Sequence, residues 1–198
     1  MAGVRLLAFS GSTRSQSFNQ RLLDLAVAEA RAAGAEVTAV SLRDFHMPLY
    51  DGDLEANDFP ASGDAFRTLM IEHDGFLIAS PEFNGSVSGV LKNAIDWASR
   101  PRAGESMVAL PAFRGKVAGI MSASISPFGG LRGLLALRQI LGTIQTLVAT
   151  EQVLTEVDAE PEGDTHYPAF DESEWTETRR EEHLDHDPAY VVRWLERR

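Results

Sequence analysis

Short apolar runs alternate along the chain with segments of helical periodicity. Five runs have the length and composition of strands buried on both faces, and they occupy residues 4–9, 37–40, 75–80, 116–122 and 143–149. Apolar residues recur at helical spacing between them, in residues 22–30, 66–70, 87–99 and 131–141. This alternation predicts a doubly wound α/β domain with a parallel sheet covered on both faces. Ligands of such sheets bind beyond the carboxyl ends of the strands, which directs attention to the loops after the first, third and fourth runs.

The loop after the first run, residues 10–19, has the sequence S-G-S-T-R-S-Q-S-F-N. Hydroxyls, backbone N–H groups and the N-terminus of the following helix can donate to an anion, and Arg14 adds a forked donor. The loop therefore predicts a phosphate site. It has neither the Gly-Lys-Ser/Thr end of a Walker loop nor G-x-G-x-x-G, which excludes an NTPase and a dinucleotide-binding Rossmann domain. The alternative is that Ser17 or Asn19 only caps the helix and the rest is a polar loop.

The loop after the third run begins P-E-F-N-G-S at residues 81–86. Asn84-Gly85 predicts a tight turn with positive φ whose backbone amides point at whatever lies over the strand end. An extended peptide with an aromatic residue suits a flat heteroaromatic ligand. Glu82 lacks a nearby His or second carboxylate, so a buried or ligand-bonded carboxylate fits it better than a general acid or base. After the fourth run, residues 122–132 combine small residues with a Gly pair, which permits close backbone approach.

Cysteine is absent from the 198 residues, which excludes a disulfide scaffold, Cys-ligated metal centres and a Cys nucleophile. The formal net charge of −11 disfavours nucleic acid and anionic membranes as partners. That charge is uneven, because residues 1–150 hold 14 acidic and 13 basic side chains and residues 151–198 hold 15 and 5. The pattern indicates a nearly neutral domain followed by an acidic C-terminal extension. With no long apolar segment and no signal h-region, we expect a cytoplasmic protein.

Together the loops resemble those of the NADPH-dependent FMN reductase family, a flavodoxin-like group that includes quinone, azo-dye and chromate reductases. The resemblance rests on G-S-T-R-S-Q-S-F-N in the first loop, on P-E-F-N-G-S-V-S-G-V-L-K-N-A-I-D-W-A-S-R-P in the third loop and its helix, and on G-G-L-R after the fourth run. It covers about residues 4–155 and implies a five-stranded parallel sheet of order 2-1-3-4-5. We expect a flavodoxin-like FMN-binding domain at residues 1–155 and an acidic, partly helical extension at residues 156–198.

The resemblance also implies which residues hold FMN. The first loop surrounds the phosphate, the third lines the isoalloxazine and ribityl, and the fourth closes the other side. The expected cofactor-binding residues are Ser12, Arg14, Ser17, Phe18, Asn19, Pro81, Glu82, Phe83, Asn84, Gly85, Ser122, Ala123 and Ser124. Phe83 stands where the family usually has Tyr, and Ile125 and Ser126 replace small or turn-forming residues. These departures bear on how an acceptor lies against the flavin.

The implied function is an FMN-dependent NAD(P)H oxidoreductase. NADPH, or NADH, passes a hydride to bound FMN, and a quinone, dye, metal oxyanion or flavin then takes the electrons in a ping-pong cycle. Hydride delivery needs no side-chain acid or base, so we expect no catalytic residue, and no metal. One alternative is a flavodoxin-like electron carrier or FMN-binding sensor without NADPH turnover. A phosphate-binding hydrolase is another, but low-molecular-weight phosphatases of this shape need a Cys nucleophile.

The partners implied by the resemblance are a small-molecule electron acceptor and further copies of the chain. A homodimer or homotetramer is expected, with the flavin near the subunit boundary. Candidates for that boundary are Leu91, Ile95 and Trp97, together with the long loop 43–60, which is rich in Asp, Pro and Gly. Loops of that length are usually functional or disordered.

The extension contains two features of its own. Glu182, His183, Asp185, His186 and Asp187 resemble metal ligands, but a solvated acidic run with two His is the commoner explanation, and the two His lie three apart without a third fixed ligand. Trp175 and the apolar side chains within residues 190–195 predict a short amphipathic helix that packs on its own or a neighbouring subunit.

Overall fold

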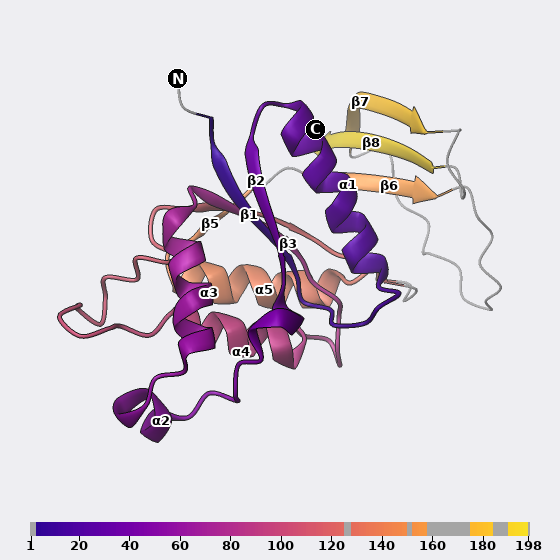
Figure 1. Cartoon of the computed structure of the whole chain (residues 1–198). Helices are drawn as coiled ribbons and strands as arrows, with labels where there is room; N and C mark the ends of the chain where they lie inside the picture. Colours follow the sequence, from indigo (N-terminus) through magenta and orange to yellow (C-terminus); the bar gives the residue numbers. More distant parts are fainter. Residues whose placement is uncertain (1–2, 125–127, 150–151, 158–174, 184–189, 198) are drawn as a thin grey trace. The chain divides into compact units, whose positions relative to one another are not determined.

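The computed structural model describes residues 3–124, 128–149, 152–157, 175–183 and 190–197 (Figure 1). The chain divides into two compact units, Met1–Ala149 and Thr150–Arg198. Each unit has a β-sheet of its own.

The first unit contains the doubly wound domain that the sequence predicts. Its strands are β1 (Arg5–Ser10), β2 (Glu36–Ser41), β3 (Gly75–Ala79), β4 (Val117–Met121) and β5 (Leu147–Val148). All neighbouring strands run parallel in the order β2-β1-β3-β4-β5, which confirms the expected flavodoxin-like sheet. The helices are α1 (Phe18–Ala32), α2 (Gly52–Asn57), α3 (Ala61–Glu72), α4 (Gly89–Ala98) and α5 (Leu131–Thr143), with a 3-10 helix η1 (Leu42–Phe45).

Helices cover both faces of this sheet. Successive residues of a strand point to opposite faces, so Leu7 and Phe9 of β1 join the core formed with α3, α4 and α5. Ala8 faces the other way and packs against Leu23 and Val27 of α1. Among the described residues, no helix is long and apolar enough to cross a bilayer.

The helices that follow β1, β3 and β4 all begin at the carboxyl-terminal edge of the sheet (Figure 1). Ser17 caps α1 by accepting a hydrogen bond from the backbone N–H of Gln20 (3.2 Å). Ser88 caps α4 by accepting from the N–H of Leu91 (3.3 Å). Gly130 precedes α5 with a φ of 87°, a backbone conformation that favours glycine. Small polar residues and glycine therefore fix where these helices start.

The segment after β2 is ordered by α4 and is not a bare loop. It contains η1 and α2, which the sequence analysis left as loop. Asn93 accepts from the N–H of Tyr50 and donates to the carbonyl of Pro48, both at 2.8 Å. The indole N–H of Trp97 donates to the same carbonyl at 2.8 Å.

The expectation that Leu91, Ile95 and Trp97 form a subunit boundary is wrong, because these side chains lie inside the first unit. Their exposed fractions are 0, 2 and 0%. The rings of Tyr50 and Phe59 pack edge-on against Trp97 with centroids 5.0 and 5.1 Å away. The strongly apolar face of α4 is explained by this core.

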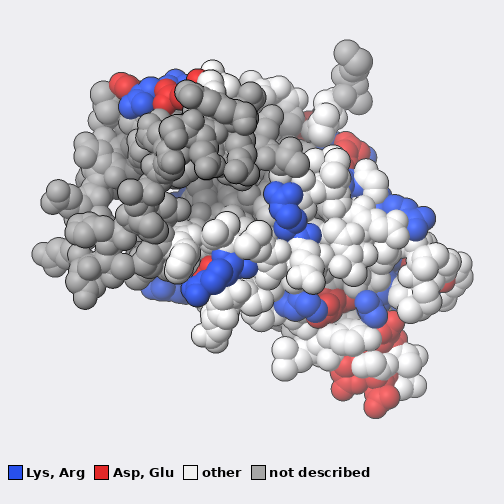
Figure 2. Space-filling model, turned by 180° about the vertical axis from the view of Figure 1, so that it is seen from behind, with Lys and Arg blue, Asp and Glu red and all other residues white. Residues whose placement is uncertain are grey.

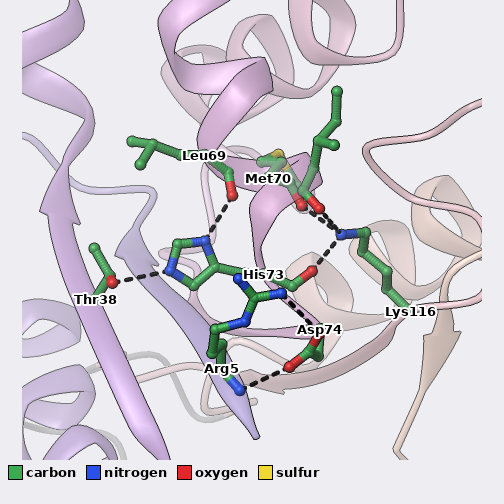
Figure 3. A network of polar contacts seen from close by, with 8 residues as sticks. Arg5, Thr38, Leu69, Met70, His73, Asp74 and Lys116 are labelled. Carbon is green, nitrogen blue, oxygen red and sulfur yellow. Dashed lines mark hydrogen bonds and ion pairs between the residues drawn. The ribbon is translucent and has the colours of Figure 1, made fainter.

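The amino-terminal edge of the sheet is closed by a network of polar contacts (Figure 3). Lys116, just before β4, donates from Nζ to the carbonyl oxygens of Met70 (2.6 Å), Ile71 (2.8 Å) and His73 at the end of α3. Burial lowers the pKa of Lys116. The His73 imidazole also contacts the Thr38 hydroxyl in β2 at 2.9 Å. These polar groups bond to each other and to the end of α3, so their role is structural. The candidate site is therefore sought at the carboxyl edge of the sheet.

The second unit is an antiparallel sheet. Its strands are β6 (Gln152–Val157), β7 (Trp175–His183) and β8 (Tyr190–Arg197), in the order β6-β8-β7. The short C-terminal helix expected around Trp175 and residues 190–195 is therefore wrong. Tyr, Val and Trp are enriched in strands, and this preference prevails over the helical spacing.

The acidic and histidine residues of the extension that resemble metal ligands fall largely outside the described residues. Asp185, His186 and Asp187 belong to that part of the chain, and Glu182 and His183 end β7. Within the described residues no group of three metal-binding side chains occurs.

Candidate functional site

Three loops meet at the carboxyl edge of the first sheet. We name them loop 1 (residues 11–17), loop 3 (residues 80–88) and loop 4 (the described residues 122–124 and 128–130) after the strands they follow. The N–H of Gly11 donates to the carbonyl of Ala79 at 2.8 Å, and the N–H of Ser80 donates to that of Met121 at 2.9 Å. The loops therefore leave the sheet side by side, as the sequence predicts for adjacent parallel strands.

Loop 1 presents hydroxyls and a guanidinium ahead of α1. Ser12 accepts from the N–H of Arg14 at 3.4 Å, and its own N–H donates to Ser10 at 3.1 Å. Arg14 is exposed, and no acidic side chain among the described residues pairs with it. Ser17 caps α1, as one of the two interpretations of this loop predicts, and Phe18 begins the helix with its ring exposed. An unpaired guanidinium beside a helix N-terminus is suited to an anion.

Asn19 joins loop 1 to loop 4. Its side chain is buried, with Nδ2 donating to the carbonyl of Ala123 and Oδ1 accepting from the N–H of the same residue, both at 2.9 Å. One amide side chain thus satisfies both backbone groups of Ala123. Ser124, the last described residue before the gap at 125–127, follows directly.

Loop 3 turns sharply beside loop 4. Asn84 and Gly85 have φ values of 52° and 76°, which confirms the predicted turn with positive φ. Phe83 and Ser86 close it with two backbone hydrogen bonds of 2.9 and 3.0 Å. Phe83 is 53% exposed, whereas Pro81 is buried. The turn offers an apolar ring and backbone amides on the same side of the sheet edge.

The Glu82 side chain is buried and forms an ion pair with Arg132. Its side chain is 4% exposed, and Oε1 accepts from Arg132 Nε at 2.8 Å and from Arg132 Nη2. Oε2 accepts from the N–H of Gly133 at 3.2 Å. Hydrogen bonds from Arg132 lower the pKa of Glu82, so the group is a carboxylate at neutral pH. It fits the buried carboxylate that the sequence favours over an acid or base.

The sequence analysis did not identify Arg132 as the partner of Glu82. The two residues lie 50 positions apart, so no local pattern could pair them. The only available signal was the arginine of the G-G-L-R motif after the fourth run.

Loop 4 contains a buried hydroxyl that has no hydrogen-bond partner, Ser122 Oγ, as judged from the described part of the chain. A Cβ at Gly130 would overlap this hydroxyl, so the close approach requires glycine. Ile125 and Ser126, the residues at which this chain departs from the family pattern, lie outside the described residues. An unpartnered buried hydroxyl at a strand end is available to a ligand.

A shallow cavity of about 330 Å³ flanks loop 1, and the sequence analysis did not find it. Its lining residues are Thr13, Leu42, Arg43, His46, Met47, Val90 and Asn93. Arg43 donates to the carbonyl of Thr13 and so fixes the outer side of loop 1. On the face that Figure 2 shows, basic side chains of the described residues are scattered, unlike the concentrated basic surface of nucleic-acid-binding proteins.

These features fit a phosphorylated flavin. Arg14, the loop 1 hydroxyls and the α1 N-terminus suit a phosphate, and the Phe83 ring and Asn84-Gly85 amides suit a planar heterocycle with polar edges. The unpartnered Ser122 hydroxyl adds a further donor on the loop 4 side. Fold and site together define a flavodoxin-like, FMN-binding class of α/β protein.

The chain belongs to the NADPH-dependent FMN reductase family, whose sequence model matches residues 4–160. An NAD(P)H-dependent FMN reductase, PA1204 of Pseudomonas aeruginosa, is 40% identical over 139 residues, covering 70% of this chain and 69% of the relative. An NADPH:quinone oxidoreductase of Arabidopsis thaliana is 43% identical over 101 residues, which is 50% of each chain. The match thus spans about half the length of the plant protein.

The fold is also similar to that of a solved flavoenzyme. The structure of FerB, a flavoenzyme NAD(P)H:(acceptor) oxidoreductase from Paracoccus denitrificans, superposes with a TM-score of 0.61 at 25% identity. The match covers 74% of this chain and 75% of FerB. A second sequence model, for dihydrofolate reductase, matches residues 142–197, which include the strands of the second unit.

Proposed function

We propose that the protein is an FMN-dependent NAD(P)H oxidoreductase that reduces a small-molecule acceptor. The observation that carries this proposal is the meeting of loops 1, 3 and 4 at one sheet edge, joined by backbone hydrogen bonds. Family membership supports it, since the relatives include proteins named FMN reductases and quinone oxidoreductases.

In this proposal Ser12, Arg14 and the N-terminus of α1, capped by Ser17, bind the FMN phosphate. Pro81, Phe83 and the Asn84-Gly85 turn contact the isoalloxazine and ribityl, with Ser122, Ala123 and Ser124 on the other side and Phe18 at the rim. Bound FMN supplies the redox chemistry, accepting a hydride from NADPH or NADH and passing electrons to a quinone, dye, metal oxyanion or flavin.

The protein's contribution is electrostatic. The backbone amides at Asn84 and Gly85 are fixed in a positive-φ turn, so they can stabilise negative charge on a bound ring without reorganising. Glu82 is the only buried carboxylate of loop 3. Arg132 pairs with it, so its negative charge is compensated within the protein and does not repel a ring that gains negative charge. The proposal also includes that nucleotide and acceptor occupy the same place against the flavin in turn, which would make the cycle ping-pong.

The proposal includes a homodimer or homotetramer with the flavin near the subunit boundary. The buried α4 face is excluded from that boundary, whereas Phe83, Phe128, Leu131 and Leu135 expose 50–56% of their surface beside loops 3 and 4 and along α5. Sedimentation velocity on the full chain measures the oligomeric state directly.

Titration of the purified protein with FMN, followed by anaerobic addition of NADPH, tests the proposal. We expect one FMN per chain, with quenched flavin fluorescence, and loss of the oxidised flavin absorbance on adding NADPH. FMN binding without reduction by either nucleotide would favour the electron-carrier alternative. A protein that does not bind FMN would contradict both.

A further inference from the structure

Three buried polar side chains join the three loops pairwise. Ser88, at the end of loop 3, donates from Oγ to the carbonyl of Gly11 in loop 1 at 2.5 Å. Asn19 joins the start of α1, next to loop 1, to Ala123 in loop 4. Glu82 of loop 3 accepts from Arg132 and Gly133, in the first turn of α5 directly after loop 4. Each pair of loops therefore has one side-chain tie.

We propose that Ser88, Asn19 and Glu82 are positioning residues, which set the separation of the three loops and so the affinity for FMN without contacting it. This inference rests on the proposed function, and it assigns Asn19 and Glu82 a role different from the direct contacts that the resemblance implies. The tie residues are all buried, with exposed fractions of 1% for Ser88, 4% for Asn19 and 4% for the Glu82 side chain.

The chemistry of each tie supports a bracing role. The Asn19 amide uses its oxygen and its nitrogen on the same residue, Ala123, which holds that backbone as a neighbouring strand would. The Ser88 hydroxyl donates to loop 1 and also accepts from the N–H of Leu91 as the cap of α4. The position of loop 1 is therefore fixed relative to the start of α4. The Glu82 carboxylate is bound from two sides, by a forked guanidinium and by a helix N–H.

The three ties form a closed ring. Because loop 1 is tied to loop 3, loop 3 to the start of α5, and loop 4 back to α1, a shift of any one loop breaks at least one of these hydrogen bonds. A site held in this way before the ligand arrives loses less conformational entropy on binding. Removing one tie should therefore loosen the loop on its far side as well as the loop that carries the substitution.

The test compares tie variants with matched controls in hydrogen–deuterium exchange and in FMN titration. Asn19→Ala is paired with Gln20→Ala, whose side chain donates to Asp24 within α1. Glu82→Gln is paired with Asp96→Asn, which neutralises a carboxylate in an ion pair with Lys92 on α4. We expect faster exchange without FMN at residues 122–124 in Asn19→Ala, and at the first turn of α5 in Glu82→Gln.

Each tie variant should also raise the FMN dissociation constant about tenfold, the effect of losing one buried or charge-assisted hydrogen bond. The control variants should stay within about twofold, which is the scale of exposed helix pairs. Exchange that changes only in the substituted loop, or an unchanged dissociation constant, would overturn the positioning role. If Asn19→Ala does not fold, Arg132→Ala tests the ring from its solvent-exposed end.

Failure of the two proposals is distinguishable. A wild-type protein that does not bind FMN contradicts the proposed function, whereas exchange in the unliganded variants still shows whether the ties hold the far loops. Normal FMN binding by every tie variant would contradict the positioning role and leave the proposed function intact.

Discussion

At the scale of single residues, the two arginines near the site differ in whether an acidic side chain pairs with them. Arg14 has no acidic partner among the described residues and stands beside a helix N-terminus. Arg132 is instead paired with the buried Glu82. The two arginines therefore have different expected roles, one toward a phosphate and one toward the protein.

Arg14→Ala separates binding of the phosphate from binding of the ring. Loss of charge-assisted hydrogen bonds to a phosphate should raise the FMN dissociation constant about 10- to 100-fold. Affinity for riboflavin, which lacks the phosphate, should not change. Fluorescence titrations of both ligands measure this, with Arg31→Ala in the last turn of α1 as the control. An equal loss for FMN and riboflavin would place Arg14 away from the phosphate.

Glu82 predicts a pH dependence of stability. Its pKa is lowered by Arg132, so its stabilisation is complete above the ordinary glutamate pKa of about 4.3 and is lost as the pH falls through the lowered value. Urea midpoints of the wild type and Glu82→Gln should differ at neutral pH and converge as the pH falls below the lowered pKa of Glu82. A difference that stays constant over this range would contradict the assignment.

Local residue patterns predicted local conformations. The Asn84-Gly85 turn and the Ser17 cap follow from the neighbours in sequence, and both are present. The tie from Asn19 to Ala123 spans 104 positions and depends on how the sheet brings strand ends together. Such contacts cannot be inferred from spacing before the fold is known.

At the scale of elements, the apolar runs in the sequence predicted the strands of the first unit. Four of the five expected strands have close counterparts, and β5 is shorter than the run 143–149. The short η1 and α2 were missed because six or fewer residues give no periodicity. In the second unit, the spacing of apolar side chains in residues 190–195 suggested a helix, but their aromatic and β-branched character favours a strand, and β8 pairs with both β6 and β7.

Lys116 is expected to stabilise the unit through the end of α3. Lys116→Met keeps the apolar stem but leaves the carbonyls of Met70, Ile71 and His73 without their donor. We expect a loss of about 2–3 kcal/mol in the free energy of unfolding, because buried acceptors remain unpaired. Urea denaturation measures it. Lys92→Met, which removes only an exposed helix pair, should cost less than about 0.5 kcal/mol, and an equal loss in both variants would contradict the capping role.

At the scale of the whole molecule, the candidate site and most of the acidity belong to different units. Loops 1, 3 and 4 lie within Met1–Ala149, whereas residues 151–198 carry 15 acidic against 5 basic side chains. The difference in charge between the two units could thus be predicted from the sequence. The antiparallel sheet of the acidic unit could not be predicted in the same way. Its strands are far apart in the sequence, and the segments between them show no apolar periodicity.

The first unit alone should bind FMN. A protein comprising residues 1–149 contains all three loops and both cores, so we expect an FMN dissociation constant within about twofold of the full chain. Isothermal titration of both proteins under the same conditions measures it. A folded truncation that has lost FMN affinity would assign part of the site to the second unit.

The most direct test of the proposed reductase is anaerobic stopped-flow mixing of the FMN-loaded protein with NADPH and, separately, NADH. We expect at least one nucleotide to reduce the flavin in a single turnover, with reoxidation by a quinone or dye restoring the oxidised spectrum. Bound FMN that stays oxidised with both nucleotides would contradict a reductase function for this chain.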